Sequence, residues 1–464
     1  MGSATPFLDY GIVALFFLII FLIGVVDRRH ITLEDYWVNG RKTNKFVLVA
    51  TMLSTFVGAG TIFGGAGFAF AGGGLAILAA AASYVVYFFL FSRFFAGRIK
   101  EFGDRHHAFT LPDFLEIRFS RNVRLAGAMV NLVTWALFLA SQILAMGAFM
   151  ALLTGVNPTV GTILGALVVI AYTSIGGLRA DIRTDVFQFC VMLVLLLLFF
   201  PLIVVRGNGL SALTSLPVSF LMGSTFASPT VYVLMFLFLG TGVFTSADIW
   251  QRAYAADTPK NARWAMAVSG MLLTLFFVMA IFFGVYGKIL LPDADSNTIV
   301  PALMQLLLPP GLFGLVLAGF FAAILSTVDT VLLLTSMTLV HDLYQKSLKR
   351  ELSPATVLRL SRWVTLLTGL VGLAVALIVF DIVHLTIEAV SFYIVLSPAI
   401  VFGFYAKKKS SSAAFWSIIL GFIATLAFFF VDPVQAFIPG LIVSFLTYVV
   451  LWAFERTPAT SVNI

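Results

Sequence analysis

Thirteen apolar segments follow one another along the 464-residue chain, separated by short polar stretches. A helix needs roughly 20 residues to cross a bilayer, and each segment is about that long or longer. The pattern predicts an all-α polytopic membrane protein with about 13 transmembrane helices. The predicted segments are 9–26, 45–70, 74–96, 122–151, 157–175, 182–206, 228–248, 262–291, 311–340, 359–380, 384–405, 412–430 and 437–454.

Composition supports this class and excludes others. Apolar residues make up 61% of the chain and charged residues 11%, against about 45–50% and about 25% in soluble domains. Intrinsic disorder needs low hydrophobicity, so it is excluded. Cys190 is the single cysteine, which excludes a disulfide framework. The chain also lacks a nucleotide loop, a nucleophile elbow and a zinc-protease motif, so we expect neither an enzyme nor an organic cofactor.

The basic residues are distributed unequally between alternate loops. Of the 28 lysines and arginines, all but Arg206 and Lys288 lie in one set of loops. Positive residues near span ends stay in the cytoplasm. We therefore expect a multi-pass protein of the cell (inner) membrane, with its N-terminus outside and its C-terminus cytoplasmic. The net charge of +7 then serves topology and lipid contact, and no nucleic-acid partner is expected.

Glycines interrupt two spans that lie five apart in the order. The second span contains Gly58-Ala59-Gly60-Thr61, and the seventh contains Gly240-Thr241-Gly242. Glycine-interrupted helices at matching places in two halves are typical of the binding site of a transporter built from inverted repeats. Helix packing through small residues is the alternative, and the pattern alone does not choose between them.

Three acids lie within apolar segments: Asp185, Asp329 and Glu388, the last with His384 one turn before it. Charges inside a membrane are costly, so such residues are functional candidates. Because no lysine or arginine lies deep in a predicted span, we expect these acids to have no basic partner. Each would be protonated, bind a cation or face water.

One helical face around Asp329 carries oxygen donors. Ala323, Ser326, Thr327 and Thr330 follow a spacing of three and four residues, which places them on one face. Hydroxyl and carbonyl oxygens suit an alkali cation better than a transition metal. Hydroxyl groups bonded to the backbone of their own helix are the alternative.

Four stretches, in order, resemble motifs of the sodium:solute symporter family, which includes the proline, galactose, sialic acid and pantothenate symporters. They are Asp35-Tyr36-Trp37-Val38-Asn39-Gly40-Arg41, Gly176-Gly177-Leu178-Arg179 with Thr184-Asp185-Val186-Phe187-Gln188, Asp248-Ile249-Trp250-Gln251-Arg252, and Ala322-Ala323-Ile324-Leu325-Ser326-Thr327.

The resemblance implies a five-plus-five inverted-repeat core of the leucine-transporter type. Residues 1–44 would hold the first helix and a cytoplasmic loop, and residues 45–206 the first repeat. An extracellular loop at 207–227 would precede the second repeat at 228–405, and 406–464 would hold two further helices and a short tail.

The resemblance also implies site residues. The Na⁺ ligands would be the carbonyls of Ser54, Val57 and Ala323 with the hydroxyls of Ser326 and Thr327. A second cation or proton site would use Asp185, Asp329 and Thr330. The solute would contact Phe56, Gly60, Thr61, Gln142, Thr241 and Thr245, with Ser83, Tyr87 and Leu239 nearby.

The implied function is Na⁺-coupled symport of a small organic solute by alternating access. The sequence has no membrane arginine for a sialic-acid-type site and no long polar side chains for a sugar, so an amino acid or a monocarboxylate is favoured. A proton-coupled symporter of the same fold and a solute-binding membrane sensor are the alternatives. The identity of the solute, the ion stoichiometry and the oligomeric state remain open.

Overall fold

The computed structural model describes residues 6–26, 32–173, 178–224, 227–348, 352–379 and 382–455. These residues are almost entirely helical, and their single β pairing is an isolated bridge between Thr43 and Ala256. Asn44 caps the helix that follows it by accepting hydrogen bonds from the amides of Phe46 and Val47.

The α-helices of the first half are α1 (Pro6–Val26), α2 (Leu33–Val38), α3 (Lys45–Phe56), α4 (Gly65–Phe68), α5 (Gly74–Phe91), α6 (Gly97–His106), α7 (Leu111–Arg118), α8 (Arg121–Thr154), α9 (Pro158–Thr173), α10 (Leu178–Val194), α11 (Phe200–Arg206) and α12 (Val218–Leu221). Those of the second half are α13 (Pro229–Phe238), α14 (Gly242–Thr245), α15 (Ala247–Ala255), α16 (Pro259–Leu290), α17 (Ile299–Leu307), α18 (Leu312–Met337), α19 (Lys346–Leu348), α20 (Pro354–Val379), α21 (Ile382–Tyr393), α22 (Ser397–Tyr405), α23 (Ser411–Phe429) and α24 (Phe437–Phe454).

Short 3₁₀ and π segments join or extend these helices. They are η1 (Asn39–Arg41), η2 (Gly60–Gly64), η3 (Ala69–Gly73), η4 (Ser92–Ala96), η5 (Leu195–Phe199), η6 (Leu210–Ser215), η7 (Leu239–Thr241), η8 (Thr338–Gln345), η9 (Ile394–Leu396) and η10 (Pro433–Gln435).

Every apolar segment predicted from the sequence forms mainly helix where the structure describes it, with breaks inside the second and the seventh. By length and composition, nine helices in the described ranges could cross a membrane, and a tenth span results if the bent pair Pro229–Thr245 and Ala247–Ala255 is one. The shorter apolar helices Phe7–Ile23, Lys45–Phe56 and Pro158–Val168 account for the remaining predicted segments. The prediction of an all-α polytopic membrane protein is confirmed.

The second predicted span is broken where its glycines stand. Helix α3 ends at Phe56, and Val57 has non-helical angles (φ −89°, ψ 64°) before the chain becomes helical again toward Gly60. The hydroxyl of Thr61 donates a hydrogen bond of 2.6 Å to the carbonyl of Phe56. A backbone carbonyl that leaves its helix inside a membrane needs such a partner or a cavity.

The seventh predicted span is broken too. The segments η7 and α14 follow α13, and Ser246 (ψ 117°) separates α14 from α15, with a bend of 49° between the two parts of the span. Helix α5 supports this break. Ser83 accepts a 2.8 Å hydrogen bond from the amide of Gly240, and Tyr87 donates one of 2.5 Å to the carbonyl of Leu237.

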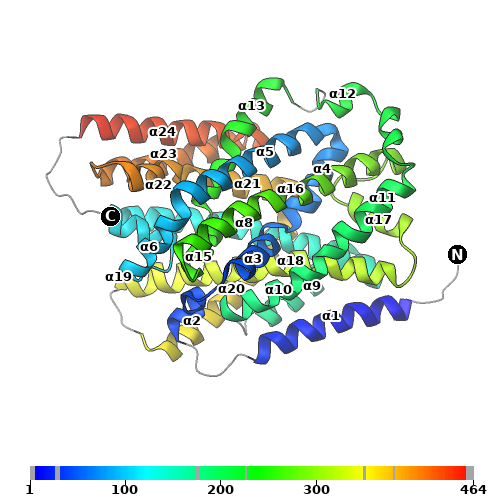
Figure 1. Cartoon of the computed structure of the whole chain (residues 1–464), viewed down its shortest axis with the longest axis horizontal. Coiled ribbons are helices and arrows are strands. Elements are labelled where there is room, and N and C mark those ends of the chain that lie inside the picture. Colours follow the sequence, from blue (N-terminus) through cyan, green and yellow to red (C-terminus); the bar gives the residue numbers. More distant parts are fainter. Residues whose placement is uncertain are drawn as a thin grey trace.

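Helix α18 lies in the middle of the bundle and is almost completely buried. It packs against α3, α8 and α10. Helix α1 lies at one edge, against α10 and α18, whereas α23 and α24 pair with each other at the opposite edge (Figure 1). The broken second span is thus held against the most buried helix of the molecule.

Candidate ion and solute site

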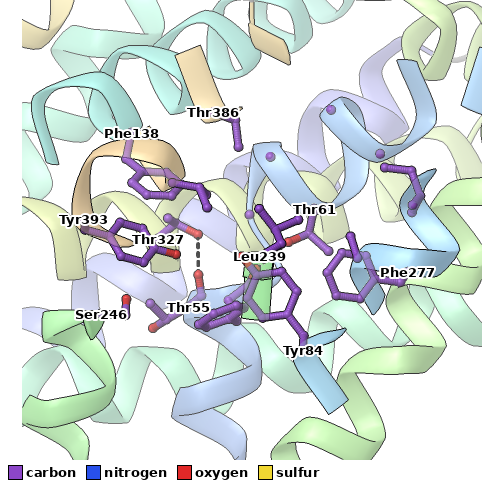
Figure 2. A pocket seen from close by; sticks show the side chains of 18 of the residues that line it. Thr55, Thr61, Tyr84, Phe138, Leu239, Ser246, Phe277, Thr327, Thr386 and Tyr393 are labelled. Carbon is purple, nitrogen blue, oxygen red and sulfur yellow. Dashed lines mark hydrogen bonds between the residues drawn. The ribbon is translucent and has the colours of Figure 1, made fainter. Parts of the chain in front are cut away.

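The hydroxyl of Thr327 connects α18 to the break of the second span. It lies 2.9 Å from the carbonyl oxygen of Thr55 and 3.1 Å from that of Ala323 (Figure 2). Gly58 permits this approach, because a Cβ atom there would lie 2.3 Å from the hydroxyl oxygen of Thr327. The predicted ligand Thr327 therefore meets the carbonyl of Thr55, a neighbour of the predicted ligand Ser54 that was not itself predicted, from a distant part of the chain.

The residues just before these two, Ser54 and Ser326, form a second contact between the same helices. The side-chain oxygens of Ser54 and Ser326 are 2.5 Å apart, and Ser326 also donates a hydrogen bond to the Asp185 carboxylate. All three side chains are buried. Within the described residues, no hydrogen-bond donor reaches the carbonyls of Ser54 and Val57. Neutral oxygens beside one carboxylate suit Na⁺, a hard cation.

Asp185 has a basic partner, contrary to our expectation. The Nη2 atom of Arg252, on α15, lies 3.2 Å from Asp185 and 3.6 Å from Asp181, and the arginine is fully buried. The same atom donates a 2.8 Å hydrogen bond to the hydroxyl of Thr330. The pattern of apolar segments placed Arg252 in a loop. The bend at Ser246 instead turns helix α15, and Arg252 with it, into the helix bundle.

The residues predicted for a second cation or proton site have different bonding partners. Thr330 lies beside Arg252 and Asp181, whereas Asp329 accepts a 2.6 Å hydrogen bond from Thr173 on α9. Glu388 is buried, and the side chain of His384 lies outside the described residues. The motif glycines Gly176 and Gly177 also lie outside them.

A cavity of about 160 Å³, partly open to solvent, adjoins the Thr327 contact. Figure 2 shows Tyr393 and Ser246 on one side and Phe277 on the other. Four of the predicted solute residues line it: Phe56, Gly60, Thr61 and Gln142. The amide of Gln142 is anchored at the break, since its oxygen accepts a 2.8 Å hydrogen bond from the backbone nitrogen of Ala59.

Two predicted solute residues do not line the cavity. The hydroxyl of Thr241 bonds to the carbonyl of Phe238 at 2.6 Å, and that of Thr245 bonds to the carbonyl of Gly242 at 3.0 Å. Each hydroxyl is used within its own helix, as is common for threonine in membranes.

Helix α5 contributes other residues to the cavity than the ones predicted from the sequence. Leu239 lines the cavity as predicted, but Ser83 and Tyr87 hold the seventh-span break and Tyr84 faces the cavity in their place. Spacing along α5 could have pointed to Tyr84, because it follows the cavity residues Ala76 and Ala80 at intervals of four.

Sequence reasoning missed Asp248, Tyr393 and Trp135 as cavity residues. The signal for Asp248 was its place at the start of the third family stretch, Asp248-Ile249-Trp250-Gln251-Arg252. That stretch also contacts the first one, because Gln251 donates a 3.1 Å hydrogen bond to the carbonyl of Trp37.

Curated relatives and a family model match nearly the whole chain. The model of the sodium:solute symporter family matches residues 36–421. The sodium/proline symporter of Escherichia coli is 26% identical over 401 residues, covering 81% of this chain and 78% of that protein. Sodium/proline symporter 2 of Staphylococcus saprophyticus is 24% identical, covering 98% of this chain and 94% of that protein.

Solved structures share the fold. A substrate-bound, outward-open Na⁺-coupled sialic acid symporter superposes with a TM-score of 0.83 at 20% identity, covering 99% of both chains. A closed nucleobase-cation-symport-1 family transporter superposes with a TM-score of 0.59 at 15% identity, covering 93% of this chain and 97% of that one. With its broken spans and its family match over most of its length, the chain belongs to the sodium:solute symporter family.

Proposed function

We propose that this protein couples the inward movement of Na⁺ to the uptake of a small organic solute by alternating access. The observation that carries the proposal is the contact of the Thr327 hydroxyl with the carbonyl of Thr55. Both residues also line the cavity. An ion bound by Thr327 beside this contact and a solute in the cavity would lie next to each other, so each would favour binding of the other.

The Na⁺ ligands in this proposal are the carbonyls of Ser54, Val57 and Ala323 with the hydroxyls of Ser326 and Thr327. One Na⁺ moving inward gains about 2.3 kcal/mol per 100 mV of membrane potential. Tenfold accumulation of a neutral solute costs about 1.4 kcal/mol. A single ion therefore supplies enough free energy for substantial accumulation.

The predicted orientation and repeats belong to the same proposal. The N-terminus would lie outside and the C-terminus in the cytoplasm, with repeats at 45–206 and 228–405 that each begin with a broken helix. The breaks after Phe56 and Phe238 support this correspondence. Since the family consists of transporters, we propose no chemical conversion of the solute and no organic cofactor.

An amino acid or a monocarboxylate is the proposed solute class. The relatives named above are proline symporters, and the cavity is mostly aromatic and aliphatic with few polar groups. Such a lining suits a small solute with one or two polar ends better than a polyhydroxylated sugar.

Proton coupling through the buried acids is the main rival. Uptake into proteoliposomes would be measured with an inward Na⁺ gradient and with choline replacing Na⁺ at fixed pH. We expect uptake only with Na⁺. Uptake that follows a pH gradient in choline would favour proton coupling, and solute binding without any uptake would favour a sensor.

A further inference from the structure

The cavity contains one charged group, and it is negative. Asp248 is the single charged residue among those that line the cavity in the described part of the chain, and it is 3% exposed. We propose that the Asp248 carboxylate anchors a positively charged nitrogen of the transported solute. This inference rests on the proposed function and narrows its solute class.

Protein groups compensate the charge of Asp248 only in part, through hydrogen bonds within its own turn and the longer-range attraction of Arg252. Its neighbour Ser246 donates a hydrogen bond to Oδ1, but no basic side chain in the described ranges lies within ion-pair distance. Arg252, four residues later on the same helix, is already paired with Asp181 and Asp185. A buried, unpaired carboxylate costs several kcal/mol. A cationic solute would offset this cost on binding.

A purely structural role in α15 does not account for a buried negative charge at Asp248. Asp248 lies in the first turn of α15, where an acid interacts favourably with the helix dipole. That interaction contributes about 0.3–1 kcal/mol, or about 2 kcal/mol at most. It is smaller than the cost of burying the charge, and an uncharged residue such as serine or asparagine would cap the helix without that cost.

Aromatic rings surround the same space. Tyr84 and Tyr393 line the cavity with Asp248, and Phe56 and Phe138 pack against them with ring centroids 5.7 Å and 6.4 Å apart, respectively. Aromatic faces attract ammonium groups by about 0.5–2 kcal/mol each. The same rings and carboxylate would repel or fail to hold a simple monocarboxylate.

The proposed Na⁺ would supply a positive charge at another part of the cavity wall, in contrast to the negative charge of Asp248. Thr55 and Thr327 line the cavity beside the proposed Na⁺. An amino acid would therefore place its nitrogen at Asp248 and its carboxylate toward the ion. A monocarboxylate has only the second of these interactions, so the structure favours amino acids and other solutes with a cationic nitrogen.

Matched probes test this assignment in purified protein. Melting temperature would be measured in Na⁺ buffer with L-proline against cyclopentanecarboxylate, with L-alanine against propionate, and with glycine betaine. We expect at least one nitrogen-bearing probe to raise the melting temperature and its nitrogen-free analogue to have no effect. The proposal would be overturned if the nitrogen-free analogues stabilised the protein as much as the nitrogen-bearing probes or more. It would also be overturned if no nitrogen-bearing probe stabilised the protein.

Variants supply the second measurement. Asp248→Asn should weaken binding of the stabilising probe at least tenfold while leaving the melting temperature of the ligand-free protein unchanged or higher. Asp257→Asn, an exposed acid just after the same helix, is the matched control and should bind like the wild type. A lower ligand-free melting temperature with unchanged probe affinity would show that Asp248 is structural.

These results separate the two proposals. Na⁺-dependent stabilisation by propionate would contradict the role of Asp248 and leave Na⁺ symport standing. Stabilisation by a nitrogen-bearing probe that needs Asp248 but not Na⁺ would support the anchor and contradict the Na⁺ coupling.

Discussion

The guanidinium of Arg252 lies 3.2 Å from the carboxylate of Asp185, and neither side chain is exposed to solvent. Asp181 and the hydroxyls of Thr51, Thr55 and Thr330 also contact the guanidinium. The place where a second cation or a proton was expected thus already contains a positive charge that is part of the protein, the guanidinium of Arg252.

This ion pair predicts that one Na⁺ is bound per transport cycle. It also predicts that replacing Arg252 lowers the stability of the protein. We expect hyperbolic Na⁺ activation of uptake in the wild type. Arg252→Gln should be destabilised by ~3–5 kcal/mol, because it leaves buried carboxylates unpaired. Adding Na⁺ should recover part of that loss, since the freed carboxylates could bind an ion. Melting temperature at increasing Na⁺ concentration measures both effects.

The double variant Arg252→Gln with Asp185→Asn is the control for this prediction. It should melt at a higher temperature than Arg252→Gln alone, because less charge is left unpaired. Sigmoidal Na⁺ activation in the wild type would contradict the assignment, since it would require a second bound ion.

Loss of either α18 hydroxyl should weaken Na⁺ activation. Thr327→Ala and Ser326→Ala each remove one proposed ligand, and a lost contact to a charged group is typically worth about 1.5–3 kcal/mol. The Na⁺ concentration for half-maximal uptake should rise about tenfold or more. Thr335→Ala is the matched control on the same helix, because that hydroxyl bonds only to the carbonyl of Val331 in the described structure. Equal Na⁺ dependence in all three variants would refute the site.

The glycine at the break of the second span should be sensitive to one added methyl group. A Cβ atom at Gly60 would lie 2.3 Å from Cγ2 of Thr386 on α21. Gly60→Ala should therefore reduce uptake or melting temperature. Thr386→Ser removes that methyl group and keeps the hydroxyl, which bonds to the carbonyl of Ile382.

The combined variant Gly60→Ala with Thr386→Ser should recover most of what Gly60→Ala loses. Uptake and melting temperature of the two single variants and the double variant measure this recovery. Strictly additive losses would show that the two residues do not interact in the working protein.

An ion-pair cluster between α7 and the segments η8 and α19, which follow α18, predicts a pH-dependent contribution to stability. Asp113 lies 3.2 Å from His341 and 2.6 Å from Lys346. Burial alone would raise the pKa of Asp113, but these two partners hold that pKa well below its usual range. The stabilisation is therefore complete at neutral pH and is lost only as the pH falls through the lowered pKa.

Asp113→Asn should reduce the free energy of unfolding by ~1–3 kcal/mol at neutral pH, less than a fully buried pair because Lys346 is partly exposed. The difference in melting temperature from the wild type should shrink in acid. Glu101→Gln, an exposed acid on α6, is the control and should melt like the wild type. A difference that grows in acid would contradict the ion-pair explanation.

Much of the fold was readable from the sequence because it depends on local properties. Apolar runs of bilayer length fixed the thirteen helical segments, and the glycines at Gly58 to Gly60 and Gly240 to Gly242 indicated both breaks. The spacing of Ala323, Ser326 and Thr327 placed them on one helix face, because helical periodicity requires it. The family resemblance then indicated which distant segment they would meet.

Only the tertiary structure decided which side chains face one another. Asp248 is the last residue of the seventh predicted segment and Arg252 lies beyond it, and the bend at Ser246 turns their helix into the bundle. Asp185 comes from a helix 67 residues earlier in the chain, so neither hydropathy nor spacing could pair it with Arg252. Thr241 and Thr245 were misassigned for a related reason: a hydroxyl can bond to its own helix, and the surrounding packing determines whether it does.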